Sequence, residues 1–253
     1  MGDPRDLFGL KGRVACVTGA SSGLGRHAAC VLAAAGARVV GVARRADVLK
    51  DLQSEIGDAA AVVAADLSDR DGIAKLAEDV AAKFGAPDIV VHAAGINTRE
   101  TADTMTPEGW DITLALNLTV PFFLSQALAG AMKQKGWGRI LNFASLQSTR
   151  AFPGGIAYGA TKGGVSQLTR AMAEAWSPHG ITANAIGPGF FPTELTQAVF
   201  ADPDRAAKNA EQTCIGRNGR MDDMDGPLLF LCSEASAYVT GQVLMVDGGF
   251  TAK

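Results

Sequence analysis

The chain has 253 residues, of which 47% are hydrophobic, 19% are charged and 6% are aromatic. This is the composition of a globular chain with one large domain, or at most two small ones, so disorder and fibrous repeats are excluded. The 23 basic and 26 acidic residues give a net charge of −3, which offers no general attraction to nucleic acid or anionic lipid. We therefore expect a small-molecule partner, and neither nucleic acid nor a membrane.

The cysteines and the N-terminal region indicate a compartment. Cys16, Cys30, Cys214 and Cys232 form no C-x-x-C pair and lie mostly among apolar residues, which fits reduced, buried thiols better than disulfides or zinc. The three histidines have no ligand spacing, so no metal site is expected. Charges interrupt the first residues and no run of about 18 apolar residues occurs. A cytoplasmic location is predicted.

Short apolar runs alternate with long Ala-rich stretches from Arg13 onward, a pattern typical of parallel strands joined by helices. Runs such as Val39–Val42 do not alternate with polar residues, which indicates strands that are buried on both faces. The fold class predicted is α/β, a doubly wound parallel sheet of the Rossmann type. The predicted strands are Arg13–Thr18, Ala37–Val42, Ala61–Asp66, Ile89–Ala93, Gly138–Ala144, Thr182–Ile186 and Gln242–Val246.

No Pro- or Ser-rich linker, charge block or internal repeat divides the chain. Residues 1–253 are therefore predicted to form a single domain. The irregular stretch 187–219 mixes Pro, Gly, Phe and charged residues. We expect short helices there, in a mobile lid at about residues 188–219.

The first predicted strand runs into a glycine-rich turn, Thr18–Gly25, and the helix-forming run Arg26–Ala33 follows. Glycines in a strand-to-helix turn let the backbone approach a pyrophosphate, and the free N–H groups at the helix N-terminus attract it. The turn therefore predicts dinucleotide binding. A tight turn without a ligand is the alternative, which the strand before and the helix after disfavour.

Tyr158 and Lys162 lie four residues apart in a predicted helix, Ile156–Trp176, and so share one face. A cation beside a phenol lowers the phenol pKa from about 10 toward the operating pH, which suits proton transfer. Ser145 follows the apolar strand Gly138–Ala144, and ligands bind at the carboxyl ends of parallel strands. These three side chains are predicted to be catalytic.

Together these motifs resemble those of the short-chain dehydrogenase/reductase superfamily, in particular its single-domain members, and the resemblance extends from Thr18 to Gly249. One departure is His92, where the family usually has Asn. The resemblance implies reversible hydride transfer between NADP(H) and a carbonyl or secondary alcohol. It rests on the glycine-rich turn, Asp66, His92–Gly95, Asn117, Ser145, Tyr158–Lys162, Pro188–Thr193 and Val246–Gly249.

Asn117 completes the catalytic set that the resemblance implies: Asn117, Ser145, Tyr158 and Lys162. It lies in a predicted helix, Trp110–Gln134, which Thr106 caps. Pro121 has no N–H to give to the Asn117 carbonyl, so the helix should kink there. In the family the corresponding Asn holds a water linked to the lysine. A kink with no chemical role is the alternative.

The second strand is followed by Ala43, Arg44 and Arg45, where an acidic residue would bind the ribose of NAD. Guanidinium groups can pair with a 2′-phosphate, so NADP is predicted, with NAD possible if the arginines are merely solvated. By resemblance, Asp66 bonds the adenine amine and Thr193 the carboxamide. The cofactor-binding residues expected are Gly19, Ser21, Ser22, Gly23, Leu24, Gly25, Arg44, Arg45, Asp66, Leu67, Ala93, Gly95, Tyr158, Lys162, Pro188, Gly189 and Thr193.

The substrate residues expected by family position are Ser145, Gln147, Tyr158, Arg99, Phe190 and Phe191. Arg99 matches a basic residue in members that resemble sugar-acid dehydrogenases such as gluconate 5-dehydrogenase; a surface arginine is the alternative. A sugar acid, polyol or related small oxo compound is therefore expected as substrate.

A 3-oxoacyl carrier-protein reductase has the same catalytic residues and is the alternative enzyme. A catalytically silent cofactor-binding sensor is the alternative from another class, which the presence of Tyr, Lys and Ser disfavours. Family members are commonly tetramers through two long helices and the C-terminal strand. A homotetramer is therefore expected.

Overall fold

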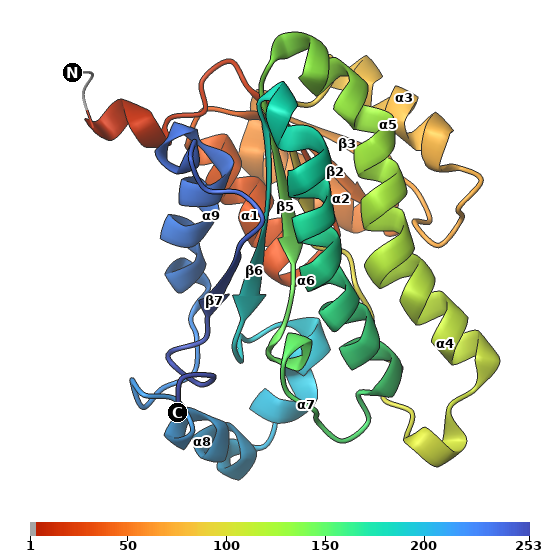
Figure 1. Ribbon diagram of the computed structural model, residues 1–253, viewed down its shortest axis with the longest axis vertical. Coiled ribbons are helices and arrows are strands. Elements are labelled where there is room, and N and C mark those ends of the chain that lie inside the picture. The colour runs from red at the N-terminus through yellow and green to blue at the C-terminus, as the bar shows by residue number, and fades with distance from the viewer. Residues whose placement is uncertain (1–3) are drawn as a thin grey trace.

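The computed structural model describes residues 4–253. Its centre is a parallel seven-stranded sheet in the order β3-β2-β1-β4-β5-β6-β7 (Figure 1). Every predicted strand is present, with ends that differ by one or two residues, as strand ends commonly do. The strands are β1 (Val14–Thr18), β2 (Arg38–Ala43), β3 (Ala60–Ala64), β4 (Ile89–His92), β5 (Gly138–Phe143), β6 (Ile181–Pro188) and β7 (Val243–Val246).

Helices cover both faces of this sheet, so the predicted doubly wound α/β fold is confirmed (Figure 1). Ala15 and Val17 of β1 belong to a buried cluster with side chains of α1, α2 and α9, whereas Cys16 joins a second cluster with α3, α5 and α6. The inner strands such as β1, β2 and β4 are buried on both faces, as their unbroken apolar sequence predicted, whereas the edge strands β3 and β7 are only partly buried. These helices are α1 (Gly23–Ala34), α2 (Ala46–Ile56), α3 (Ile73–Phe84), α5 (Val120–Lys135), α6 (Ile156–Trp176) and α9 (Asp225–Cys232).

The helix that carries Asn117 is not uniform. It begins as α4 (Pro107–Leu114), widens into a π-helical turn over Ala115–Thr119 and continues as α5. Thr106 caps it by accepting a hydrogen bond from the Gly109 N–H at 3.0 Å. The kink expected at Pro121 takes the form of this widened turn, one of the known ways in which a helix is distorted locally.

The same helix, Pro107–Lys135, is long and apolar enough to cross a membrane by length and composition alone. It is a core helix here, because Val120, Leu124 and Leu128 are buried in the cluster between the sheet, α3 and α6. A core helix of a globular fold passes the same test.

His92, the departure from the family pattern, ends β4 and is 3% exposed. Its Nε2 lies 2.7 Å from the Ser125 hydroxyl of α5. Within residues 4–253 its Nδ1 has no hydrogen-bond partner. Burial lowers the pKa of this imidazole to about 3, because a charged ring in an apolar core loses its hydration. His92 is therefore neutral at ordinary pH and ties the sheet to α5.

The segment after β6 contains short helices, as its composition predicted. They are a 3₁₀ turn over Glu194–Thr196, α7 (Gln197–Phe200) and α8 (Pro203–Glu211). We call residues 188–219 the lid segment. It lies beside the carboxyl ends of the strands (Figure 1).

Candidate active site

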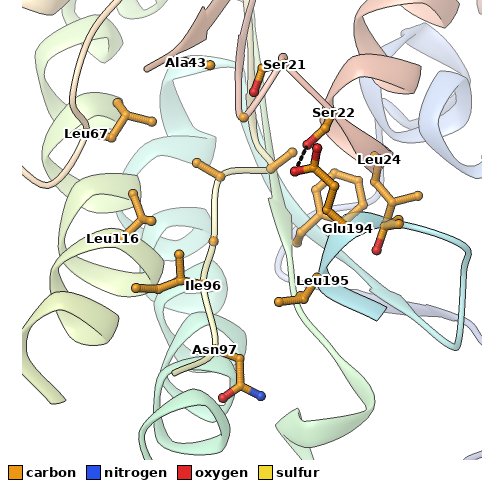
Figure 2. Close-up of a pocket in the computed structure, with 18 of the residues that line it drawn as sticks. Ser21, Ser22, Leu24, Ala43, Leu67, Ile96, Asn97, Leu116, Glu194 and Leu195 are labelled. Atoms are coloured by element: carbon orange, nitrogen blue, oxygen red, sulfur yellow. Dashed lines mark hydrogen bonds between the residues drawn. The ribbon is translucent and has the colours of Figure 1, made fainter. Parts of the chain in front are cut away.

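A cleft of about 620 Å³ opens where β1, β2, β4 and β5 end. In Figure 2, Ser21 and Ser22 lie at one end of this cleft and Asn97 at the other, with Leu195 of the lid segment across from Ile96. The carboxyl edge of a parallel sheet is where such folds bind ligands. The cleft therefore lies where the sequence placed the site.

The glycine-rich turn packs too closely to admit side chains. A Cβ on Gly25 would lie 2.4 Å from the Gly19 carbonyl oxygen, and a Cβ on Gly19 would lie 2.7 Å from the Ala94 nitrogen. Gly19 also has φ of 69°, a region that favours glycine. The two glycines hold β1, α1 and the loop after β4 in contact.

Ser22 is the N-cap of α1, but its side chain makes no capping hydrogen bond. Its hydroxyl donates to Glu194 instead, at 2.9 Å. The first N–H groups of α1 consequently have no side-chain acceptor, although serine at this position usually supplies one. A helix N-terminus left in this way suits a phosphate, so the turn fits the pyrophosphate of a dinucleotide.

Tyr158 and Lys162 share the inner face of α6 and are 9% and 5% exposed. The Lys162 ammonium lies 5.5 Å from the centre of the Tyr158 ring and donates to the Phe143 carbonyl at 2.6 Å. This hydrogen bond ties α6 to the end of β5, just before Ser145. The four-residue spacing therefore brings the phenol and the ammonium to one cleft, as the sequence predicted.

The pKa of Tyr158 shifts in a direction that the sequence did not predict. Burial raises the pKa of the phenol, while a hydrogen bond with Ser145 and the charge of Arg99 oppose the rise. Burial also lowers the pKa of Lys162 to about 8. The sequence predicted a lowered phenol pKa, because it indicates the charge of Lys162 as the main influence on that pKa. Desolvation outweighs the neighbouring charges here.

Asn117 lies in the π-helical turn and uses its side chain to hold the loop after β4. The Asn117 amide accepts from the Ile96 N–H and donates to the Ile96 carbonyl, both at 2.9 Å, and also donates to Thr161 of α6 at 3.2 Å. The side chain is thus fully engaged with protein. The Asn117 backbone carbonyl is the group left to bind a water, because Pro121 has no N–H to donate to it.

Arg45 and Arg44 both line the cleft beyond β2. Arg45 forms a two-pronged ion pair with Glu194, at 2.9 and 3.1 Å, and donates to the Ser21 hydroxyl at 3.1 Å. The charge of Arg44 contributes to lowering the pKa of Asp66, after the two hydrogen bonds from Ser68, which are the larger causes. Both arginines and Asp66 therefore surround one end of the cleft.

Most of the other expected cofactor residues line the same cleft. Thr193 lies against the glycine-rich turn, because a Cβ on Gly23 would approach its side chain to 3.2 Å. The remaining members of this group are Ser21, Ser22, Leu24, Leu67, Ala93, Gly95 and Pro188. Gly189 is the exception, since it lines a second cavity of about 330 Å³.

Several expected substrate residues are not brought to the cleft. Phe190 and Phe191 line the second cavity, and Phe190 packs edge-on against Phe152 and Phe250. Gln147 directs its Oε1 toward Gly155 and Gly159. Arg99 donates to the Leu195 carbonyl of the lid segment. The two rings thus form a wall of the second cavity rather than of the cleft, and Phe190 packs against Phe250 near the C-terminus.

Sequence reasoning missed two kinds of residue in the cleft. Part of the cleft wall is formed by apolar side chains: Ile112 of α4, Leu116 of the π-helical turn and Leu195 of the lid segment. Glu194, which bonds both Arg45 and Ser22, was also missed. Its position directly after Thr193 was a usable signal, since a lid residue next to an expected cofactor contact also faces the cofactor.

Within residues 4–253, no group of three or more His, Cys, Asp or Glu side chains is arranged to hold a metal ion. The site instead combines a dinucleotide-type glycine turn with a buried tyrosine, a lysine and a nearby serine. This combination on a Rossmann-type sheet defines an oxidoreductase that uses a nicotinamide dinucleotide.

Comparison with known proteins places the chain more closely. The family described as Enoyl-(Acyl carrier protein) reductase matches residues 19–251. Gluconate 5-dehydrogenase of Gluconobacter oxydans (strain 621H) is 40% identical, with 97% of each chain covered. 2-dehydro-3-deoxy-D-gluconate 5-dehydrogenase of Dickeya dadantii (strain 3937) is 40% identical, over 98% of this chain and 99% of that protein.

A solved structure is similar over the whole chain. It is a gluconate 5-dehydrogenase from Burkholderia cenocepacia J2315 in complex with NADP and tartrate, 37% identical, with a TM-score of 0.93 over 99% of this chain and all of that one. The chain belongs to the short-chain dehydrogenase/reductase superfamily and is an NAD(P)-dependent oxidoreductase. Its relatives act on sugar acids and polyols.

Proposed function

We propose that the protein transfers hydride reversibly between NADP(H) and a secondary alcohol or ketone of a sugar acid or polyol. One observation carries the proposal: Tyr158 and Lys162 line the same cleft as the glycine-rich turn and two arginines. The bound cofactor would supply or accept the hydride. The protein residues then have to bind the two reactants, orient them and move one proton.

Tyr158 is the proton donor in reduction and the acceptor in oxidation. In reduction its phenol proton goes to the substrate oxygen as the carbonyl carbon receives the hydride; in oxidation both transfers reverse. Ser145, which interacts with Tyr158 through a hydrogen bond, orients the substrate oxygen. Lys162 would hold the ribose with its buried ammonium. The Asn117 carbonyl would anchor the water that connects this group to solvent.

NADP is the cofactor we propose. Ala43 stands where an acidic side chain would favour NAD, and Arg44 and Arg45 line the same end of the cleft. A guanidinium pairs well with a phosphate. The similar gluconate 5-dehydrogenase with NADP and tartrate supports this choice.

A sugar acid is the substrate class we propose, with Arg99 as the group that would meet its carboxylate. Arg99 lies close enough to the catalytic centre for its charge to act on Tyr158, and tartrate in the similar structure is itself a hydroxy acid. The apolar wall of Ile112, Leu116 and Leu195 favours a second candidate, reduction of a 3-oxoacyl group on a carrier protein.

A panel assay separates these candidates. Gluconate, 2-dehydro-3-deoxygluconate, galactitol and a 3-oxoacyl thioester would each be tested with NADP(H) and NAD(H). Arg99→Ala is expected to raise KM for the sugar acids about ten-fold or more, as for loss of a charge-assisted hydrogen bond, and to leave KM for the polyol unchanged. Turnover of the thioester alone would replace the proposal by the second candidate.

A paired substitution tests the cofactor. Arg44→Ala with Arg45→Ala is expected to raise KM for NADP about 10- to 100-fold and to change KM for NAD little, because only NADP carries the 2′-phosphate. Equal effects on both cofactors would reject the choice of NADP.

We also propose a homotetramer in the cytoplasm. β7 lies at the edge of the sheet, with Leu244 exposed upon it, and such an edge is commonly covered by a second chain. All four cysteines are free thiols; Cys16 and Cys232 are buried as expected, whereas Cys30 is half-buried and Cys214 is exposed, so the expectation of burial was wrong for these two. Free thiols suit a reducing compartment. Sedimentation of the purified protein at several concentrations measures the assembly.

A further inference from the structure

Glu194 of the lid segment forms an ion pair with Arg45, the residue that we propose to bind the cofactor. Glu194 accepts two hydrogen bonds from Arg45, at 2.9 and 3.1 Å, and one from the Ser22 hydroxyl, at 2.9 Å. Figure 2 shows Glu194 directed from the lid segment toward Ser22. In the sequence, Glu194 lies 149 residues from Arg45 and 172 residues from Ser22.

The surroundings of Glu194 are those of an anion site. A guanidinium fork, a serine hydroxyl and the N-terminus of α1 all favour a negative charge. The hydrogen bond from Arg45 lowers the pKa of Glu194, and the same bond raises the pKa of Arg45. The carboxylate is thus charged at neutral pH and occupies donors that a phosphate would otherwise use.

We propose that Glu194 is a cofactor-specificity residue, an internal counter-ion for Arg45 that competes with the 2′-phosphate of NADP. This inference rests on the proposed use of Arg45 in NADP binding. NAD leaves the pair of Arg45 and Glu194 intact, because its 2′-hydroxyl carries no charge. NADP has to draw Arg45 away from Glu194 and bring a second negative charge beside it. Glu194 therefore reduces the preference for NADP over NAD that Arg44 and Arg45 create.

Glu194→Gln removes the charge and keeps the shape of the side chain. The pair is about half exposed, with 45% of the Arg45 and 61% of the Glu194 side chain accessible, so its strength is that of a surface ion pair. The variant is expected to bind NADP about two- to five-fold more tightly, relative to NAD, than the natural protein does. Glu211→Gln, at the exposed end of α8, removes the same charge from the lid segment and should leave the ratio unchanged.

Binding of nucleotide fragments measures this effect without catalysis. Adenosine 2′,5′-bisphosphate carries the 2′-phosphate, whereas adenosine 5′-monophosphate lacks it, and calorimetry gives Kd for each. We expect Glu194→Gln to lower Kd for the bisphosphate two- to five-fold more than Kd for the monophosphate. In an Arg45→Ala background this difference should disappear, because the ion pair between Arg45 and Glu194 is already absent.

The outcomes separate the inference from the function on which it rests. If Arg45→Ala weakens the bisphosphate selectively while Glu194→Gln changes both fragments equally, Glu194 has no part in specificity and the inference fails alone. If Arg45→Ala weakens both fragments equally, the proposed role of Arg45 fails as well. Weaker binding of adenosine 2′,5′-bisphosphate by the Glu194→Gln variant would also overturn the inference.

Discussion

The two ends of the cleft are built in different ways. Tyr158 and Lys162 are at most 9% exposed and project from one long helix that is fixed to β5 through the Phe143 carbonyl. The side chains of Arg45 and Glu194 are 45% and 61% exposed; Arg45 is the N-cap of α2, and Glu194 begins the 3₁₀ turn of the lid segment. The end that we propose to move a proton is thus buried in the fold, and the end that we propose to select the cofactor lies at its surface.

This difference predicts how each end responds to substitution. A buried ionisable group feels desolvation strongly, so its pKa and the stability of the fold depend on the same packing. An exposed ion pair contributes little to stability and is easily exchanged. Changes at the catalytic end should therefore be large and costly, whereas changes at the surface end should be small and confined to specificity.

The largest expected effect is on the proton donor. Tyr158→Phe should lower kcat at least 100-fold while the affinity for NADP changes little, because only the transferable proton is lost; general acid–base catalysis contributes about 10²–10⁴-fold. Steady-state kinetics and a binding titration measure the two quantities. A variant that keeps more than about a hundredth of the natural kcat would contradict the assigned role.

A second large effect concerns stability in acid. His92 has a pKa of about 3 in the folded protein and an ordinary value of about 6.5 when unfolded. Stability from the neutral ring is fully present above pH 6.5 and is lost as the pH falls toward 3. The loss by pH 5 is about 2 kcal/mol.

His92→Asn should remove this acid-dependent part. The free energy of unfolding, measured by urea at pH 7 and pH 5, should then fall less in the variant than in the natural protein, whatever its value at pH 7. An equal fall in both proteins would show that His92 is not the titrating group.

A smaller effect should separate stability from proton delivery. Pro121→Ala restores an N–H that can bond the Asn117 carbonyl, so we expect the free energy of unfolding to rise by about 1 kcal/mol. We expect kcat to fall most at the pH values where proton delivery to Tyr158 limits the rate, because the carbonyl is no longer open to a water.

Gly130→Ala is a matched control for that variant. Gly130 lies in α5, and a Cβ there would meet nothing within 4 Å, so the substitution should raise stability by about 1 kcal/mol through helix propensity alone. Its pH profile should not move. If Pro121→Ala behaves in the same way, the proline only shapes the helix.

The smallest expected effect is a shift in a pH profile. The charge of Arg99 lowers the pKa of Tyr158, and oxidation needs the phenolate, so Arg99→Ala should move the rise of the oxidation rate to higher pH, by less than about one unit. Arg99→Lys keeps the charge on the same strained backbone, with φ of 59°. A shift of equal size in Arg99→Lys would mean that geometry, not charge, is responsible.

Sequence predicted the buried half of the site better than the exposed half. The bounds of α6 agree with the expected Ile156–Trp176, and the strands appear in the expected places, because local hydrophobic patterns carry that information. The π-helical turn before Pro121 was foreseen only as a kink. Nothing local distinguishes the two, since the widened turn accompanies hydrogen bonds between Asn117 and Ile96, which lies 21 residues earlier in the chain.

The contact between Glu194 and Arg45 could not be predicted from the sequence, because it joins two segments 149 residues apart that meet only in the folded protein. The rise in the pKa of Tyr158 escaped for a similar reason. Spacing identifies the neighbouring ammonium of Lys162, but the burial that raises the pKa of Tyr158 depends on the surrounding fold.

α8 has a consequence for how this protein can diversify. None of its nine residues, Pro203–Glu211, is buried; it is held by the Asp202 cap at its start, by a hydrogen bond from Asn218 to the Ala206 carbonyl and by one from Lys253 to the Glu211 carbonyl at its end. Replacing or lengthening it would leave the two hydrophobic clusters untouched. α8 is thus a part of the lid segment whose length and sequence can change while the core sequence stays constant.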